Sequence, residues 1–334
     1  MEETQRIQQR IGEYLKAKFP EREELSVGEI RGERGGESHS IFMFTAHWRE
    51  AQAWVSEDLI IRMEPEIGIV QPYDIRREYE VMKRVHEGGV PIPRVYCCEE
   101  ESKVLERPFM VMEKIEGESL PTVWLKQPDH RVQLMKDYVS ILLKIHGLNW
   151  HALSLSFLGV PESEHQYAEK EIARWDWMLK RNQYNPYPIM SGLVNWLKRN
   201  IPRAERTTVC HGDYTMSNAY VRDGRVVSIF DWEIAGLGDP TSDVAWACFF
   251  GEYIKTPDWD ETAFLHIYED MTGTKVNERS LLFWKALAYL KIAAITTASL
   301  RAGNESQNIS TRLMVLATIF LPRIQDGAAR MLGF

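Results

Sequence analysis

The chain has 334 residues, of which 44% are hydrophobic and 26% charged, the balance of an ordinary globular protein with one large or two modest domains. The formal net charge of −8 and the absence of any basic run argue against a nucleic-acid partner. The N-terminus lacks the apolar core of a signal peptide and the longest apolar region, 284–300, contains two lysines, so we expect a cytoplasmic protein with no membrane partner.

The first third of the chain combines two helices with several short strands. Apolar residues at helical spacing predict a helix over residues 1–24, and a second helix is expected at 73–87. These helices and strands together predict a small N-terminal lobe with a mixed β-sheet, residues 1–115. The runs with strand character, separated by Gly-rich or polar turns, are 25–30, 39–48, 58–63, 94–99 and 108–115.

A glycine-containing turn lies between the first two predicted strands. Its residues Gly35, Gly36 and Ser38 are small, so main-chain N–H groups there can approach phosphate oxygens closely. A Gly-Gly turn is also an ordinary connection between strands, so this feature alone leaves both interpretations open. The chain has no Gly-x-x-x-x-Gly-Lys-Ser/Thr sequence, which gives no support to a Walker-type nucleotide hydrolase.

A charged pair is expected between the strand 58–63 and the helix 73–87. The alternation of the strand places Arg62 on one face together with Ile60. Glu78 stands within the apolar stripe of the helix, where an unpaired carboxylate would be costly. Arg62 is its natural partner, either in an ordinary salt bridge or in a ligand site.

Beyond Gly117 the pattern becomes largely helical. Helices are expected over 131–148, 167–181 and 191–200, and again from about residue 240 to the end. A strand-rich lobe followed by a helical lobe is α+β in outline. We therefore expect a second, helical lobe over residues 116–334.

One short hairpin interrupts the helical part and carries the chemistry. Asp223-Gly224 between apolar runs is a strong signal for a tight turn, which places residue 218 roughly opposite residue 229. Asn218 and Asp231 then meet at the open end, and one carbonyl oxygen with one carboxylate suits Mg²⁺. Asp213, in the loop just before, remains available as a base. In phosphoryl transfer an Asp takes the hydroxyl proton while Asn and Asp hold the nucleotide's metal.

These residues and their surroundings resemble the aminoglycoside phosphotransferase/choline kinase family, which shares the protein-kinase-like fold. Within that family the chain is similar to the bacterial branch related to the kinase-like domains fused to some acyl-CoA dehydrogenases. The likeness follows the family's order over roughly residues 25–300. The segments that carry it are 210–218, 229–233, 76–79, 90–95, 109–113, 237–240, 243–245, 173–175 and 195–197.

The resemblance implies a two-lobe protein-kinase-like fold in which the N-lobe binds the nucleotide. The glycine turn would cover the phosphates, the Arg–Glu pair would hold them, and the strand end at 112–115 would bind the adenine through its main chain. Arg stands where protein kinases have Lys, and its planar cation binds with a different geometry. The residues given a nucleotide-binding role are Gly35, Gly36, Ser38, Arg62, Glu78, Glu113 and Ile115.

In the helical lobe the resemblance implies that Asp213 is the catalytic base and that Asn218 and Asp231 bind Mg²⁺. His211 is expected to be a buried support for the loop, with substrate contact as the alternative. Asp243 matches the acidic residue that anchors the catalytic loop in this fold, and is expected to be structural.

The predicted function is an ATP- and Mg²⁺-dependent O-phosphotransferase acting on a small-molecule hydroxyl, with GTP as an open alternative to ATP. A group of aromatic and Met residues in the helical lobe either packs the core or lines a partly apolar acceptor pocket, and the second interpretation favours an acceptor such as a hydroxyacyl thioester or a macrolide-like compound. An aminoglycoside kinase and a non-catalytic nucleotide-binding protein remain alternatives, and the oligomeric state is open. The residues in that group are Trp175, Trp177, Trp196, Trp259, Trp284, Met178 and Met190.

Overall fold

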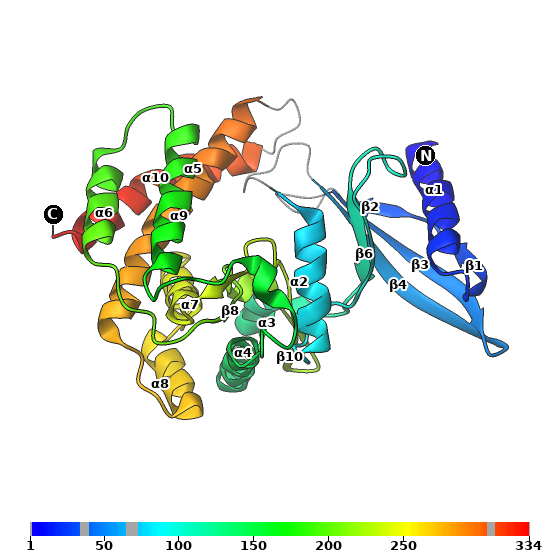
Figure 1. Cartoon of the computed structure of the whole chain (residues 1–334), viewed down its shortest axis with the longest axis horizontal. Coiled ribbons are helices and arrows are strands. Elements are labelled where there is room, and N and C mark those ends of the chain that lie inside the picture. Colours follow the sequence, from blue (N-terminus) through cyan, green and yellow to red (C-terminus); the bar gives the residue numbers. More distant parts are fainter. Residues whose placement is uncertain (1, 34–39, 65–72, 306–310, 334) are drawn as a thin grey trace. The chain divides into compact units, whose positions relative to one another are not determined.

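The structure is a computed structural model that describes residues 2–33, 40–64, 73–305 and 311–333. The chain forms two compact units (Figure 1). Unit 1 comprises Met1–Gly68, Pro72–His86 and Ile92–Glu116, and unit 2 comprises Ile69–Gln71, Glu87–Pro91 and Gly117–Phe334.

Unit 1 is built on one sheet with strand order β1-β3-β4-β6-β5, to which β2 is added beside β3. Every pairing among its described strands is antiparallel, so the prediction of a mixed sheet was wrong in that respect. Antiparallel neighbours need only a tight turn, whereas a parallel pair needs a long crossover. The elements of this unit are α1 Glu2–Lys18, β1 Glu23–Val27, β2 Arg31–Glu33, β3 Ser40–Glu50, β4 Ala53–Met63, α2 Ile75–Glu87, β5 Val95–Glu99 and β6 Phe109–Glu113.

The hairpin of β3 and β4 is longer than the sequence pattern predicts. The two strands pair without interruption from Ser40 opposite Met63 to Glu50 opposite Ala53. The turn residues Ala51 and Gln52 both have positive φ, 47° and 69°. A two-residue turn with both φ values positive matches the twist of a hairpin, but Ala and Gln rarely adopt it, so no turn signal is present at these residues.

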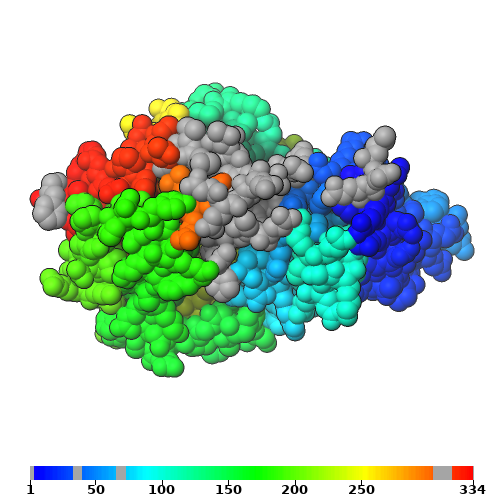
Figure 2. Space-filling model, turned by 90° about the horizontal axis from the view of Figure 1, so that it is seen from above, coloured from blue at the N-terminus to red at the C-terminus, as the bar shows by residue number. Residues whose placement is uncertain are grey.

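Unit 2 is mainly helical, which confirms the predicted α+β arrangement of a strand-rich part followed by a helical part. Its long helix α9 packs against α5, α6, α7 and α10. Figure 2 shows α10 (red) beside α6 (green) on one face of the molecule. The elements of this unit are β7 Glu118–Ser119, α3 Leu120–Lys126, α4 Arg131–His146, α5 Gln166–Asn182, α6 Pro188–Arg199, β8 Thr208–Cys210, β9 Ala219–Arg222, β10 Arg225–Ile229, β11 Gly236–Gly238, α7 Thr241–Tyr253, α8 Glu261–Thr272, α9 Glu278–Glu305 and α10 Thr311–Met331.

Helix α9 is long and apolar enough over Glu278–Gly303 to cross a membrane by length and composition. However, 67% of its most apolar window is buried inside the fold. The central helix of a packed helical unit meets the same criteria, because it is apolar on nearly all sides. We therefore describe α9 as the core helix of unit 2.

Candidate active site

Strands β9 and β10 form the predicted hairpin. Asp223 and Gly224 make its turn with φ values of 52° and 72°. A register shift between Val226 and Ser228 places Ala219, rather than Asn218, opposite Ile229. A bulge adds one residue to one strand, which sequence periodicity does not reveal.

The open end of this hairpin brings Asn218 and the chain around Asp231 together. The main-chain N–H of Phe230 donates to the main-chain carbonyl of Asn218 at 2.8 Å, and Asp231 is the next residue after Phe230. Asp231 has a φ of 69°, which is uncommon for a residue other than glycine but is tolerated by Asp and Asn. Such a conformation costs of order 1–3 kcal/mol and is typical of functional sites.

The carboxylate of Asp213 is held on both of its oxygens. The Asn218 side-chain amide donates to Oδ2 at 2.8 Å and to the Asp213 main-chain carbonyl at 2.9 Å. The Trp246 indole N–H donates to Oδ1 at 2.7 Å. Because the two donors approach different oxygens, the plane of the carboxylate is fixed.

The orientation of Asn218 also bears on metal binding. Its amide nitrogen faces Asp213, so the carbonyl oxygen Oδ1 lies on the other edge of the amide. The part of the chain that the structure describes has no group of three or more His, Cys, Asp or Glu side chains placed to hold a metal. Mg²⁺ usually keeps several waters and binds through one or two protein ligands plus substrate phosphates. The Asn218 amide oxygen and the Asp231 carboxylate are oxygen donors of the kind that Mg²⁺ takes, so these residue types fit such an ion.

The loop that carries Asp213 is anchored by Asp243, at the start of α7. The main-chain N–H groups of His211 and Gly212 donate to its two oxygens, each at 2.8 Å, and the His146 ring lies 3.2 Å from Oδ2. Burial alone would raise the pKa of Asp243, but its hydrogen bonds and the nearby His146 hold that pKa below 3.8. The carboxylate is therefore a stable anchor for the loop.

His211 is completely buried beneath the loop. Its Nε2 lies 2.9 Å from the Phe230 carbonyl, and the Asp213 main-chain N–H donates to Nδ1 at 3.1 Å. A carbonyl only accepts, so Nε2 carries the hydrogen and Nδ1 the lone pair of a neutral imidazole. Burial lowers the pKa of His211 below 6.5, which favours the same neutral form. This geometry agrees with a structural role and leaves the ring no exposed surface for a substrate.

Gly212 makes the turn between His211 and Asp213. Its φ is 84°, and a Cβ added there would lie 2.7 Å from the Ile234 carbonyl oxygen. Only glycine meets both requirements, the left-handed backbone and the close approach.

Two residues of this site were missed by the sequence analysis, Trp246 and Lys291. The Lys291 ammonium group donates to the Gly212 carbonyl and lies 3.7 Å from the centroid of the Trp246 ring. The sequence analysis used Lys291 only as an interruption of an apolar stretch. That interruption was itself the signal, because a lysine within a core helix is seldom buried unless it has a partner.

In unit 1 the predicted pair of Arg62 and Glu78 is present. Arg62 Nη2 lies 3.1 Å from Glu78 Oε1, and the Glu78 side chain is fully buried. Tyr73, which the sequence analysis did not single out, donates from its hydroxyl to Glu78 Oε2 at 2.6 Å. The carboxylate in the apolar stripe of α2 is therefore held from two sides.

The predicted hinge residues follow each other at the end of β6. The main-chain N–H of Glu113 donates to the Arg94 carbonyl at 2.8 Å, so a bond from Glu113 to a base would have to use its carbonyl. Ile115 lies two residues further on. Gly35, Gly36 and Ser38, of the predicted phosphate turn, lie outside the described residues.

Most of the aromatic and Met group does not form the wall of a pocket. Trp175, Met178, Met190 and Trp284 are buried in the core of unit 2, on the sides of α5, α6 and α9 that face one another. These four side chains therefore pack the core of unit 2. The sequence could not separate core from pocket, because both require the same apolar side chains.

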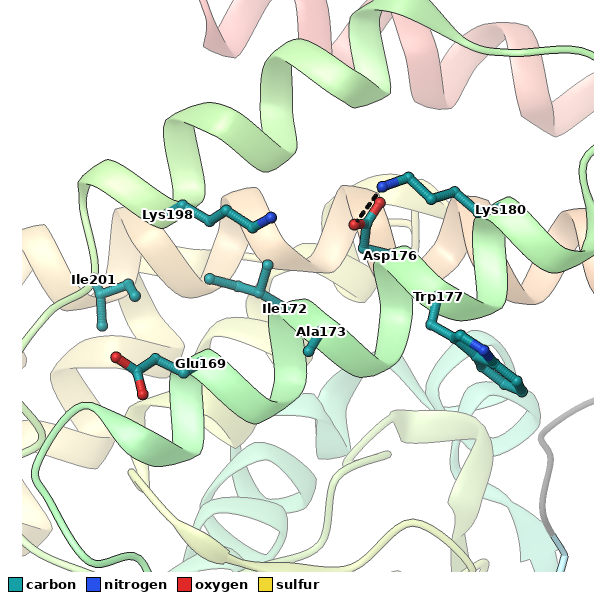
Figure 3. Close-up of a pocket in the computed structure, with 8 residues that line it drawn as sticks. All are labelled: Glu169, Ile172, Ala173, Asp176, Trp177, Lys180, Lys198 and Ile201. Atoms are coloured by element: carbon teal, nitrogen blue, oxygen red, sulfur yellow. Dashed lines mark hydrogen bonds and ion pairs between the residues drawn. The ribbon is translucent and has the colours of Figure 1, made fainter.

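Trp177, 47% exposed, lines a surface pocket of about 560 Å³ between α5 and the end of α6 (Figure 3). Asp176 and Lys180 form an ion pair of 2.7 Å at this pocket. Neither Asp213 nor Asn218 nor Asp231 lines it. The pocket is therefore separate from the predicted catalytic residues.

Comparison with known proteins gives the family. A profile of the phosphotransferase enzyme family matches residues 47–284. Mouse acyl-CoA dehydrogenase family member 10 is 31% identical over 199 residues, covering 57% of this chain and 18% of that protein. Rat acyl-CoA dehydrogenase family member 11 is 26% identical over 289 residues, covering 78% of this chain and 35% of that protein. The chain thus spans only a minor part of the length of these relatives.

Solved structures agree on the fold. A putative aminoglycoside phosphotransferase from Ralstonia eutropha JMP134 superposes with a TM-score of 0.73 at 22% identity, covering 96% of this chain and 98% of its own. A thermostable mutant of an aminoglycoside phosphotransferase, in a ternary complex with ADP and hygromycin B, superposes with a TM-score of 0.61 at 15% identity, covering 96% of this chain and 98% of its own. The predicted protein-kinase-like fold is confirmed. The chain belongs to the phosphotransferase enzyme family.

Proposed function

We propose that the protein is a small-molecule kinase that transfers the γ-phosphoryl group of ATP to a hydroxyl group, with Mg²⁺ bound beside the nucleotide. The observation that carries the proposal is the Asp213 carboxylate, which Asn218 and Trp246 hold on opposite oxygens. A carboxylate fixed in this way can accept a proton from a hydroxyl without first reorienting.

In this mechanism the acceptor hydroxyl oxygen bonds to the γ-phosphorus while the bond from the γ-phosphorus to ADP breaks, and the hydroxyl proton passes to Asp213. General-base assistance of this kind is worth roughly 10²–10⁴ in rate. Asn218 Oδ1 and the Asp231 carboxylate would hold Mg²⁺, which when bound neutralises charge on the phosphate oxygens.

We assign nucleotide binding to residues 1–115, and catalysis and acceptor binding to residues 116–334. Arg62, oriented by Glu78, would bind the phosphates, and the glycine turn of Gly35, Gly36 and Ser38 would cover them. The Glu113 carbonyl and the Ile115 main chain would bind adenine. A structural neighbour solved with ADP supports an adenine nucleotide in preference to GTP.

For the acceptor we propose a hydroxyacyl thioester. The support is that both reported curated relatives are named as acyl-CoA dehydrogenase family members. The second candidate is an aminoglycoside, because a structural neighbour was solved with hygromycin B. We place the reaction in the cytoplasm, where both ATP and acyl thioesters occur.

The test is a mass-spectrometric search for phosphorylated products. Purified protein with Mg²⁺ and ATP is offered hydroxyacyl-CoA esters of several chain lengths, aminoglycosides, macrolides and choline-like alcohols. The Asp213→Asn protein is run beside an Asp223→Asn protein. Asp223 undergoes the same chemical change at the turn end of the hairpin, where Asn also tolerates its φ of 52°.

We expect product from the wild-type and Asp223→Asn proteins and a rate roughly 10²–10⁴ lower from Asp213→Asn. The acyl thioester is the wrong acceptor if only aminoglycosides are phosphorylated. Binding of ATP without any product across the panel would favour the non-catalytic alternative.

A further inference from the structure

We propose that Trp246 and Lys291 are positioning residues that fix the orientation of the Asp213 carboxylate for proton transfer. Trp246 acts on that carboxylate directly, and Lys291 acts through Trp246 and through the Gly212 carbonyl. The inference rests on the proposed role of Asp213 as the base.

The contact of Trp246 is specific to one carboxylate oxygen. Trp246 is 4% exposed on α7, and its N–H reaches Asp213 Oδ1 at 2.7 Å while Asn218 holds Oδ2 at 2.8 Å. The last torsion of an Asp side chain has a broad energy profile, so a carboxylate held at one oxygen can rotate. Two donors at different oxygens remove that freedom.

Lys291 links the indole to the main chain of the catalytic loop. Its ammonium group lies 3.7 Å from the Trp246 ring centroid and 5.4 Å from that of Trp175, and it donates to the Gly212 carbonyl. A cation over the face of a tryptophan is attracted by the negative face of the ring. The same ammonium therefore holds both the indole that orients Asp213 and the residue that precedes Asp213.

A packing role alone does not account for Lys291. It is 4% exposed on the core helix α9, where Leu or Met would fill the same space without the cost of burying an ammonium group. Its contacts are the Gly212 carbonyl and the two indole rings. Burial lowers the pKa of Lys291, as does the charge of Arg174, whereas the charges of Asp213, Glu171 and Asp243 oppose this and favour the ammonium form. With these contacts, the buried ammonium group of Lys291 orients the loop before Asp213, whereas Leu or Met would only fill the space.

The experiment compares Trp246→Phe with a matched control, Trp284→Phe. Phe keeps the aromatic face and removes the N–H donor in both variants. The Trp284 N–H also donates to a buried carboxylate, Asp239 Oδ2 at 2.9 Å, but Asp239 is not the base. The rate is measured as ADP release from ATP, with water as the acceptor and with the hydroxyl compound that gives product in the panel.

We expect kcat of Trp246→Phe to fall roughly ten- to a hundredfold, the effect of one hydrogen bond to a charged group. KM for ATP and for the acceptor should stay within about twofold, because neither ligand loses a contact. Trp284→Phe should lose comparable stability in urea while keeping its kcat. A kcat of Trp246→Phe equal to that of Trp284→Phe would overturn the inference.

Lys291→Met tests the second step, since Met has a similar length and no charge or donor. We expect kcat to fall about tenfold in the wild-type background and by a smaller factor in the Trp246→Phe background, because only the route through the Gly212 carbonyl then remains. Independent, multiplying effects of the two substitutions would contradict the proposed link through Trp246.

Asp213→Asn separates this inference from the proposed function. If Trp246 acts through Asp213, the double variant Trp246→Phe/Asp213→Asn should be no slower than Asp213→Asn alone. A normal rate for Asp213→Asn would remove the base and with it this inference. A slow Asp213→Asn protein with a normal Trp246→Phe protein would leave the base in place and reject the positioning role.

Discussion

Asp243 Oδ2 accepts a hydrogen bond of 2.8 Å from the His211 main-chain N–H, although 32 residues separate the two in the chain. Gly212 donates to the other oxygen of the same carboxylate, also at 2.8 Å. One buried carboxylate on α7 thus sets the path of the loop that presents Asp213. The orientation of the proposed base depends on a residue that would touch neither substrate nor nucleotide.

Replacing Asp243 by Asn should damage both stability and catalysis. Asn has only one acceptor oxygen, so its NH₂ group would face one of the two N–H donors. We expect a loss of about 3 kcal/mol in the free energy of unfolding, the range for a broken buried charge pair. Urea unfolding measures this loss, and ADP release should show a lower kcat in the fraction that remains folded.

The stability of the protein should fall as the pH is lowered below neutrality. The folded-state pKa of His211 lies below 6.5 and that of Asp243 below 3.8, so the unfolded chain binds more protons at both sites. The stabilisation is therefore present above each unfolded-state pKa and is lost as the pH falls through the folded-state value. The urea midpoint should decrease as the pH falls below about 6.5. In His211→Gln this first decrease should be absent; its persistence would assign it to another group.

Gly212→Ala should be far more damaging than Gly273→Ala. Both glycines have positive φ, 84° and 67°, but a Cβ at Gly212 would lie 2.7 Å from the Ile234 carbonyl whereas Gly273 has nothing within 4 Å. An alanine with positive φ costs about 1–2 kcal/mol in the free energy of unfolding through backbone strain alone. Gly273→Ala measures this strain by itself and should keep full activity. Gly212→Ala adds the displacement of the loop, and we expect a larger loss in urea unfolding together with a loss of kcat. Equal effects of the two substitutions would mean that the loop adapts to a methyl group.

Arg62→Met should destabilise unit 1 and weaken nucleotide binding. Glu78 would keep its buried carboxylate and lose the cation at 3.1 Å, which costs about 3–5 kcal/mol. The control is Arg76→Met, whose partner Glu100 lies at 3.0 Å in an exposed pair, where the loss should be below about 1 kcal/mol. Urea unfolding and titration with ATP measure the two effects. Unchanged ATP affinity in Arg62→Met would reduce the pair to an ordinary salt bridge.

Asp231→Asn should raise the Mg²⁺ concentration needed for half-maximal ADP release. Asn tolerates the φ of 69° at this position, so the substitution removes charge without adding backbone strain. A chelator such as EDTA should abolish turnover of the wild-type protein, and excess Mg²⁺ should restore it. An Asp231→Asn protein with an unchanged Mg²⁺ requirement would exclude Asp231 as a metal ligand.

The local features of the site were accessible from the sequence because each depends on neighbours a few residues apart. Asp223-Gly224 predicts its own turn, and this turn brings the chain at Asp231 back to Asn218. The five-residue spacing of Asp213 and Asn218 allows their side-chain contact within a single short loop. The pair of Arg62 and Glu78 could be predicted because Glu78 is a carboxylate within an otherwise apolar helix stripe. A buried carboxylate needs a partner wherever the helix packs.

The tertiary structure alone decided which distant residues complete the site. Trp246 lies 33 residues from Asp213, and Lys291 lies 79 residues from Gly212. Their meeting depends on how α7 and α9 pack against each other, and periodicity reports that a helix face is apolar without saying what it faces. The same limit explains why the sequence left Trp175 and Trp284 open between the core and a pocket wall. Local chemistry determined the loop of the proposed base, and long-range packing determined what holds that loop in place.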